Sequence, residues 1–322
     1  MSDIAISRTS TQIVRYFGWS VLGLLAAFLI NNVLVVAYDS PSLATGLDGK
    51  SAVALLIYLA GPVIAVLFVT MRKDATLRHD AHSIHTFNLY LIRAVFFSVV
   101  LIGIVDASLA FMRVENLLGA FFSDDMVRDL GRSKFVGPYV HTPLIVVGFV
   151  IAGFSRTLGF PWLALLIVVA ELGIVISRFV FSYEQALMGD LVRYWYAALF
   201  LFASAYTLYD EGHVRVDILY AGLSRSRKGI SNAVGAVFWG ASTCWVILAI
   251  GMGSKQSIVN SPIANFEISQ AGNIGMFTKY QMAGFIAIFA VTMLIQFVSY
   301  FFESVADFRD EPGAREFTPV SH

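Results

Sequence analysis

The stretch YTLYDEGHVRVDILYAGLSRSRK, residues 206–228, is a charged segment between two long apolar runs. The run before it extends over residues 187–209, and the run after it covers residues 229–254. At ~1.5 Å per residue, either run in a helical conformation is long enough to cross a hydrocarbon layer of about 30 Å. The stretch therefore predicts a turn between two membrane helices, on a side of the membrane that its basic residues identify.

The composition extends this interpretation to the whole chain. Of its 322 residues, 57% are hydrophobic and 14% are charged, and the mean hydropathy is +0.73. Such a chain cannot form one water-soluble core without exposing a large apolar surface, so we expect an all-α, polytopic membrane protein. The 22 basic and 22 acidic residues cancel, which leaves no basic excess for binding nucleic acid. The lone Cys244 lies in an apolar run and predicts a packing role.

Eight apolar stretches are candidate membrane spans, namely residues 17–38, 51–71, 87–112, 142–154, 161–182, 187–209, 229–254 and 280–302. The fourth is short, and the number falls to seven if this stretch is re-entrant. Pro161 suits the first turn of its helix, where the missing amide hydrogen costs no internal bond, so it marks a helix start. Arg8 and Arg15 precede the first run as in a signal peptide. That run is too long and lacks a small-residue cleavage site, so we interpret it as a retained helix.

Basic residues between the spans predict the orientation of the chain. Twelve lie on the side that holds both termini and the loops 72–86, 155–160 and 210–228, and seven lie on the other side. This difference favours cytoplasmic termini. On the opposite face, residues 113–140 form either a short interfacial helix or an ordinary solvated loop, and residues 255–279 are expected to be irregular. We expect both segments to be available to a periplasmic partner.

Two carboxylates lie deepest within the predicted spans, Asp106 and Glu171. A charge at a helix centre costs roughly 2.5–3.5 kcal/mol on insertion scales, so such groups are rarely kept without a partner. One hypothesis makes the two residues proton or cation ligands. The alternative, which we favour, makes them hydrogen-bonding contacts between helices.

The predicted outer turn between the fifth and sixth spans has charged residues on both sides. Arg178 and Arg193 flank this turn, which also carries Glu184 and Asp190. Long arginine stems can reach such an interface, so each arginine is expected to pair with a carboxylate or a lipid phosphate. Interfacial anchoring and a subunit contact both remain open as functions.

Three histidines, His79, His82 and His85, recur every three residues beside Asp80. On a helix they could bind a metal, but a polar cytoplasmic loop is the expected setting. The other histidines lie at span ends or in the tail, so we expect no imidazole inside a helix to ligate haem. Paired carboxylates within the spans, a GxSxG motif and an HExxH motif are also lacking, and we expect no catalytic activity.

Helix pairing by a GxxxG motif is excluded, because no two of the 25 glycines lie four residues apart. Contacts between helices are therefore expected to use other small residues. The clearest cluster lies on the helix that leads into the charged stretch and consists of Ala197, Ala198, Ala203, Ser204 and Ala205.

Four short motifs resemble one known family. They are SRFVF at 177–181, DLVRY at 190–194, ASAYTL at 203–208 and GHVRVD at 212–217. Together they resemble the small membrane subunit, or DctQ family, of the tripartite ATP-independent periplasmic (TRAP) transporters. The last motif is the most specific. The similarity runs from about residue 160 to residue 309, with four spans in the places that the family shows.

The resemblance implies an accessory permease subunit of a bacterial inner membrane. In that family the small subunit binds a large multi-pass permease subunit, which moves an organic acid with sodium, and a soluble periplasmic protein delivers the acid. The resemblance implies no cofactor or metal. An independent proton- or ion-coupled carrier that uses Asp106, Glu171 and Arg178 is the alternative.

The resemblance also implies a division of the chain and a set of contact residues. We expect an N-terminal four-helix membrane extension at 1–158, a DctQ-like four-helix domain at 159–309 and a cytoplasmic tail at 310–322. The extension departs from the usual small subunit, which has only four helices. The expected subunit or lipid contacts are Arg178, Glu184, Asp190, Arg193, Gly212, His213, Arg215 and Asp217.

Overall fold

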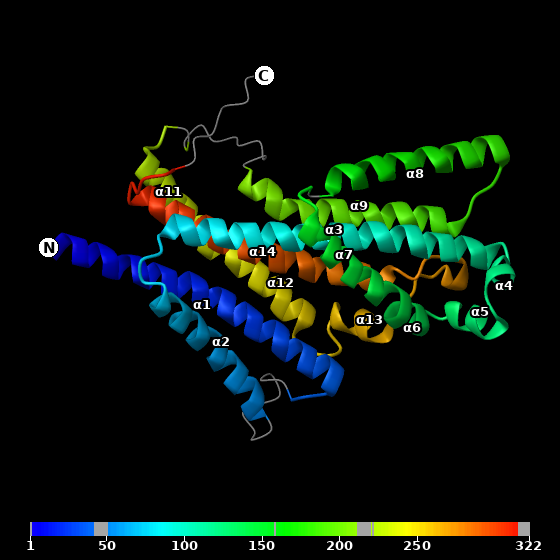
Figure 1. Cartoon of the computed structure of the whole chain (residues 1–322), viewed down its shortest axis with the longest axis horizontal. Coiled ribbons are helices and arrows are strands. Elements are labelled where there is room, and N and C mark those ends of the chain that lie inside the picture. Colours follow the sequence, from blue (N-terminus) through cyan, green and yellow to red (C-terminus); the bar gives the residue numbers. More distant parts are fainter. Residues whose placement is uncertain (1, 42–50, 158, 211–219, 221, 315–322) are drawn as a thin grey trace. The chain divides into compact units, whose positions relative to one another are not determined.

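The computed structural model describes residues 2–41, 51–157, 159–210, 220 and 222–314, and within these ranges it contains helices and no strands (Figure 1). The helices are α1 (Ser2–Tyr38), α2 (Ala52–Met71), α3 (Leu77–Val114), α4 (Leu118–Phe121), α5 (Asp124–Leu130), α6 (Ser133–Val136), η3 (Gly137–His141), α7 (Thr142–Phe154), α8 (Phe160–Phe181), α9 (Ala186–Tyr209), α11 (Arg225–Gly235), η4 (Ala236–Ala241), α12 (Ser242–Met252), α13 (Asn260–Asn265), η5 (Gly272–Ile274) and α14 (Lys279–Phe308).

Eight helices among the described residues are long and apolar enough to cross a membrane. The fourth spans Ser133–Phe154, because α6 and the π-helical turn η3 lead directly into α7. The seventh spans Arg225–Met252 in the same way, with the π-helical turn η4 between α11 and α12. The prediction of an all-α protein with about eight membrane helices is confirmed, and the fourth span is longer than the sequence suggested.

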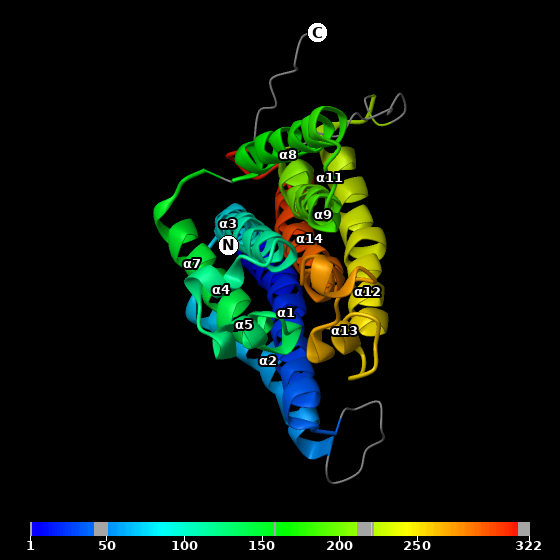
Figure 2. The same ribbon diagram turned by 90° about the vertical axis from the view of Figure 1, so that its right-hand side faces the viewer.

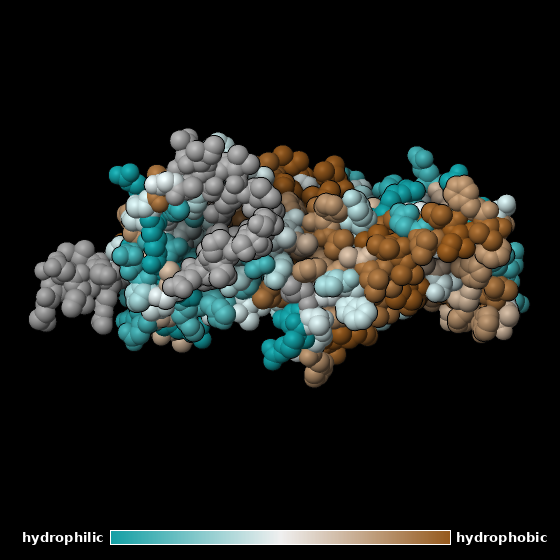
Figure 3. Space-filling view, turned by 90° about the horizontal axis from the view of Figure 1, so that it is seen from above, coloured by the Kyte–Doolittle hydropathy of each residue, from teal (hydrophilic) through white to brown (hydrophobic). Residues whose placement is uncertain are grey.

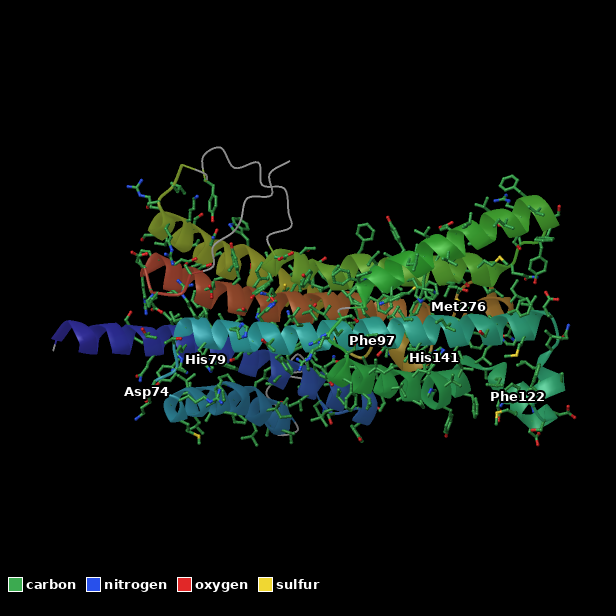
Figure 4. All side chains as sticks on the ribbon, turned by 45° about the horizontal axis from the view of Figure 1, so that its top comes forward. Asp74, His79, Phe97, Phe122, His141 and Met276 are labelled. Atoms are coloured by element: carbon green, nitrogen blue, oxygen red, sulfur yellow. The ribbon has the colours of Figure 1, made fainter. Side chains whose placement is uncertain are left out.

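The loop predicted between the second and third spans is much shorter in the structure, and in this respect the prediction was wrong. α3 begins at Leu77, so the predicted loop histidines lie on a helix. Figure 4 labels Asp74 in the turn and His79 in the first turns of α3. A buried charge is tolerated here because Asp80 bonds Arg15 at 2.7 Å.

The ends of α8 follow from local sequence. Gly159 precedes the helix with φ +88°, a conformation that costs glycine little, and Pro161 lies in the first turn as predicted. Ser182 ends the helix with φ +51°. On the predicted outer face, residues 113–140 contain α4, α5 and α6, whereas residues 255–279 contain only the short elements α13 and η5.

The chain divides into two compact units by packing. Unit 1 comprises Met1–Phe87, Leu208–Val246 and Met293–His322, and unit 2 comprises Asn88–Thr207 and Ile247–Thr292. Each unit takes residues from both sides of residue 158. The boundary expected at that residue divides the chain by its resemblance to a family and not by packing. It stays a prediction.

Within unit 1, α1 and α2 lie side by side (Figure 1, Figure 2). Gly23 and Gly61 face each other across this pair: a Cβ on Gly23 would lie only 2.4 Å from the carbonyl oxygen of Gly61. Trp19 and Phe68 pack against each other with ring centroids 4.7 Å apart. Two single glycines on different helices thus allow a close approach, which the search for glycine pairs within one helix did not predict.

Within unit 2, the core is built on aromatic and small residues. Phe96 and Phe202 are fully buried and make an edge-to-face contact. The indole of Trp195 donates to the carbonyl of Val99 at 3.2 Å and fills the space that a side chain at Gly103 would need. Of the small residues expected to make contacts on α9, Ala198 and Ala205 are fully buried.

Candidate functional site

A buried polar network in unit 2 is centred on Asp106 of α3. Its carboxylate is completely buried, and Oδ2 accepts a hydrogen bond of 2.7 Å from the backbone N–H of Phe277. The other oxygen, Oδ1, lies 3.4 Å from Nε2 of His141, which is also completely buried. The carboxylate thereby connects α3 with η3 and with the segment just before α14.

The partners of His141 determine which ring nitrogen holds its proton. Nδ1 lies 2.8 Å from the hydroxyl of Tyr280 and 2.9 Å from the amide nitrogen of Gln281. The same amide nitrogen donates to the Tyr280 oxygen at 3.0 Å, and Tyr194 donates to the Gln281 oxygen. One order of donors satisfies all members: Tyr194 to Gln281, Gln281 to Tyr280, and Tyr280 to Nδ1. This order leaves the proton on Nε2, directed at Asp106.

The network suits a structural role better than a ligand role. Nε2 of His141 and Oδ1 of Asp106 have no closer hydrogen-bond partner among the described residues, so they are available to each other. A buried carboxylate that meets a backbone donor and an imidazole holds helices together because separation would leave buried polar groups unpaired. For Asp106 this arrangement agrees with the interpretation that the residue connects helices.

An apolar cavity of about 340 Å³ adjoins this network within unit 2. Its polar side chains are those of Ser98, Tyr194, Tyr280 and Gln281, and the remaining lining is chiefly Val, Ile and Phe side chains. Figure 4 labels His141 on the segment that leads into α7. The apolar lining fits side-chain packing or a hydrocarbon group, and it offers no charge pair to a hydrophilic substrate.

The second intramembrane carboxylate has different surroundings. Glu171 lies in the middle of α8 and is exposed. No described residue bonds or pairs with it, so the structure does not place it between helices of this chain. An uncompensated charge at this depth costs roughly 2.5–3.5 kcal/mol.

The surface of α8 around Glu171 is apolar and largely uncovered. Only Leu163 and Ile167 are buried along the whole helix. The space-filling view shows a predominantly brown surface over α8 (Figure 3). An exposed apolar helix suits a lipid or a protein partner.

The predicted arginine and carboxylate contacts at the outer turn divide into two pairs. Arg178 lies 3.4 Å from Glu184, and the two side chains are 61% and 58% exposed. Such an exposed pair adds little stability. Arg193 lies 4.0 Å from Asp190, whose other carboxylate oxygen accepts the N–H of Met276 at 3.1 Å. Asp190 thus holds a loop, whereas Arg193 remains exposed.

A cavity of about 480 Å³ lies beside the second pair in unit 2. Arg193 and Lys279 supply positive charge to its lining, and Asp190 supplies negative charge.

A further polar contact at the outer turn joins Tyr183 and Glu115. The Tyr183 hydroxyl donates to Glu115 at 2.5 Å, and this hydrogen bond is the main cause that raises the pKa of Tyr183. The outer face therefore combines charged groups of both signs.

Unit 1 contains a buried ion pair that the sequence did not predict. Arg15 and Asp80 are fully buried, and Asp80 also accepts the indole N–H of Trp19 at 2.9 Å. Arg15 further donates to the carbonyl of Arg72 at 2.7 Å. The sequence showed Arg15 only as a flanking positive charge, because its partner lies in a distant part of the chain.

A second charged cluster in unit 1 surrounds Arg78. Its guanidinium donates to Glu303 at 2.8 Å and to Asp307 at 2.9 Å. Asp307 is also 3.1 Å from Arg225 at the start of α11. The beginnings of α3 and α11 are thus tied to the end of α14.

The histidines differ from the sequence expectation. His85 and His141 are both buried within helices, so the expectation that no imidazole lies inside a helix was wrong. His85 contacts Gln296 at 3.0 Å and stacks on Tyr209. In the described part of the chain, no group of three or more His, Cys, Asp or Glu side chains could hold a metal ion.

Four predicted contact residues, Gly212, His213, Arg215 and Asp217, lie outside the described residues. Three residues of the network around Asp106 were missed in the sequence, namely His141, Tyr280 and Gln281, and they had one faint signal. Each of them stands at the start of a predicted span, at 142–154 or at 280–302. A span that begins a few residues earlier would place these polar side chains inside the membrane.

Comparison with known proteins gives one match. No curated protein and no solved structure shows significant similarity to the chain. Residues 164–306, a little under half of the chain, match the family described as tripartite ATP-independent periplasmic transporters, DctQ component. The matched region begins within α8 and ends within α14, and it contains four of the eight membrane helices. Residues 164–306 are therefore similar to the DctQ component of the TRAP transporters, and the additional apolar helices that precede them fit an extra N-terminal membrane region.

Proposed function

We propose that this chain is the small permease subunit of a TRAP transporter. It scaffolds the large permease subunit for sodium-coupled uptake of an organic acid, which a periplasmic binding protein delivers. The match of residues 164–306 to the DctQ component is the observation that carries this proposal. DctQ is a component of transporters, so the family argues for a role in transport rather than in catalysis.

The surroundings of the charged residues support an accessory role. Asp106 is engaged by a backbone N–H and by His141, and Arg178 contacts Glu184. A substrate pathway in a membrane needs polar groups that converge on a water-accessible cavity. The exposed apolar surface of α8 offers no such pathway and is free to pack against lipid or another membrane protein.

The outer turn supplies candidate contacts beyond α8. Arg178, Glu184 and Arg193 are exposed, and we assign them to contacts with the large subunit or with lipid phosphates. Asp190 contributes indirectly, because it positions the loop before α14. Arg215 and its neighbours Gly212, His213 and Asp217 belong to the same proposal on the basis of the family motif.

The location follows from the family and the charge distribution. We place the chain in a bacterial inner membrane with both termini in the cytoplasm. Twelve basic residues against seven support this orientation. The cluster of Arg78, Arg225 and Asp307 agrees with the placement of these three segments on one side of the membrane, and the count of basic residues identifies that side as cytoplasmic.

The additional helices before residue 159 are proposed to widen the scaffold. Gly23 and Gly61 allow α1 and α2 to pack in close contact as one helical pair. Such a unit could cover more of the large subunit or extend the outer face toward the periplasmic binding protein. The division into segments 1–158, 159–309 and 310–322 belongs to this proposal.

The alternative function is an independent proton- or ion-coupled carrier that uses Asp106, Glu171 and Arg178. The described contacts argue against it because these residues share no partner: Asp106 is buried in its network, Arg178 pairs with Glu184, and Glu171 is exposed. We therefore rank the accessory role first.

Uptake by reconstituted proteoliposomes tests the proposal. A panel of radiolabelled carboxylic acids is offered with an inward sodium gradient to vesicles that hold this chain alone, the large subunit alone, or both, with the binding protein outside. We expect uptake only with all three components. Sodium- or proton-driven uptake by this chain alone, abolished by Asp106→Asn or Glu171→Gln, would establish the carrier instead.

A further inference from the structure

Glu171 lies at the centre of the most exposed membrane helix of unit 2. α8 extends over Phe160–Phe181, so the carboxylate is on the order of 15 Å from either end of the helix. A glutamate stem cannot reach either membrane surface from that depth. Without a partner molecule, the exposed carboxylate of a membrane-spanning α8 would face hydrocarbon.

The helix itself offers no group to neutralise this carboxylate. The residues one turn away on the same helix are Ile167, Val168, Ile174 and Val175, and all are apolar. Arg178 lies two turns away and contacts Glu184 at 3.4 Å. A partner for this carboxylate must therefore come from outside the described residues.

The exposed face next to Glu171 is suited to a neighbouring helix. Val168 and Val175 lie one turn before and one turn after the carboxylate, and they are 63% and 48% exposed. Leu172 beside them is also more than half exposed. A single acceptor within an apolar stripe gives a partner helix one depth and one orientation at which to bind.

We propose that Glu171 is the recognition group through which α8 binds a membrane helix of the large permease subunit, and that this helix presents a hydrogen-bond donor at mid-membrane depth. The inference rests on the proposed function, since it names the contact used by that partner. The donor is an Arg, Lys or His side chain, because a cation compensates the carboxylate charge most completely.

Other occupants satisfy the carboxylate less well. Lipid tails have no donor, so a lipid-facing Glu171 would have a carboxylate without a hydrogen-bond partner. A second copy of the chain packed on the same face would bring two Glu171 carboxylates together, and like charges repel unless they share a proton. A donor from a different chain leaves no buried group unpaired.

Photo-crosslinking of the full chain with the large subunit tests this contact while Glu171 stays intact. A photoreactive residue is placed at Val168 or Val175, on the Glu171 face, or at Val169, which is 57% exposed on the opposite face. We expect crosslinks to the large subunit from positions 168 and 175 and few from position 169. Crosslinks to a second copy of this chain, or to lipid alone, would overturn the inference.

Variants of Glu171 supply the second arm. Glu171→Leu is expected to lower the yield of co-purified large subunit about tenfold, as loss of one charged hydrogen bond implies, and Glu171→Gln is expected to retain part of the yield. The control is Val169→Leu, which keeps an apolar surface. Because Glu171 is exposed, each variant should unfold at the same temperature as the unmodified chain.

The two proposals can fail separately. A complex that forms at full yield with Glu171→Leu and gives no crosslink from positions 168 and 175 overturns the α8 contact and leaves the subunit assignment intact. If the unmodified chain forms no complex with the large subunit, the subunit assignment fails and the α8 contact fails with it.

Discussion

The contribution of a buried polar residue to the stability of this protein depends on how many hydrogen-bond partners it has in the folded chain. Asp106 receives a backbone N–H and faces His141, whereas Glu171 has the same chemistry and is exposed. The sequence presented both simply as intramembrane carboxylates. Their difference arises from neighbours that are distant along the chain, and we expect substitution of Asp106, but not of Glu171, to lower the stability of the isolated chain.

Replacing Asp106 by leucine should destabilise the folded protein. The change leaves the Phe277 N–H and His141 Nε2 buried without an acceptor, at a cost of about 2–4 kcal/mol. Denaturant unfolding in mixed micelles measures the free energy of unfolding. Ser108→Ala on the same helix is the control, because that exposed hydroxyl bonds only its own helix. Equal stability of the two variants would show that the network contributes nothing.

Glu311 gives a prediction about pH. Burial raises the pKa of Glu311, and attraction by Arg309 and Arg78 offsets this rise only in part. A carboxyl whose pKa is raised on folding stabilises the folded state below its unfolded pKa, about 4.3, and this stabilisation is lost as the pH rises through the folded pKa.

Glu311→Gln removes this dependence. We therefore expect the melting temperature of the variant, relative to the unmodified chain, to increase between pH 4 and pH 7. Differential scanning fluorimetry in detergent provides the measurement. A difference that is constant or decreases over this range would contradict the assigned cause.

At the level of helices, close approach depends on where a glycine lies. A Cβ on Gly23 would lie 2.4 Å from the Gly61 oxygen, whereas a Cβ on Gly173 meets nothing within 4 Å. Gly23→Ala should therefore destabilise the protein by about 1–3 kcal/mol through overpacking. Gly173→Ala should be neutral or slightly stabilising, because alanine favours the helix. If both substitutions had the same effect, close packing of α1 against α2 would not be the cause.

The helices themselves could largely be predicted, because long runs without charged residues are recognisable without knowledge of their neighbours. α8 and α9 follow the predicted spans within a few residues. The start of α3 could not be predicted, since its polar first turns are compensated by partners elsewhere. Arg78, for example, bonds a residue 225 positions away. The His141–Tyr280 contact joins residues 139 positions apart, so the candidate site was equally hidden.

The orientation of the whole molecule has a direct test in cysteine labelling. The lone Cys244 is only 3% exposed, so introduced cysteines can be read against a low background. Gln256→Cys, on the predicted periplasmic side, should react with a membrane-impermeant maleimide in intact cells. Ser224→Cys, on the predicted cytoplasmic side, should react only after the membrane is opened. The reverse pattern would place both termini in the periplasm.

The central claim is that this chain functions as a subunit of a larger assembly, and native mass spectrometry of the tagged chain tests it most directly. The chain is purified in mild detergent from membranes that also contain the large permease subunit. We predict a species heavier than the 35.4 kDa of this chain by the mass of one or more copies of the large subunit. A spectrum that contains only this chain or its homo-oligomers would contradict the assignment.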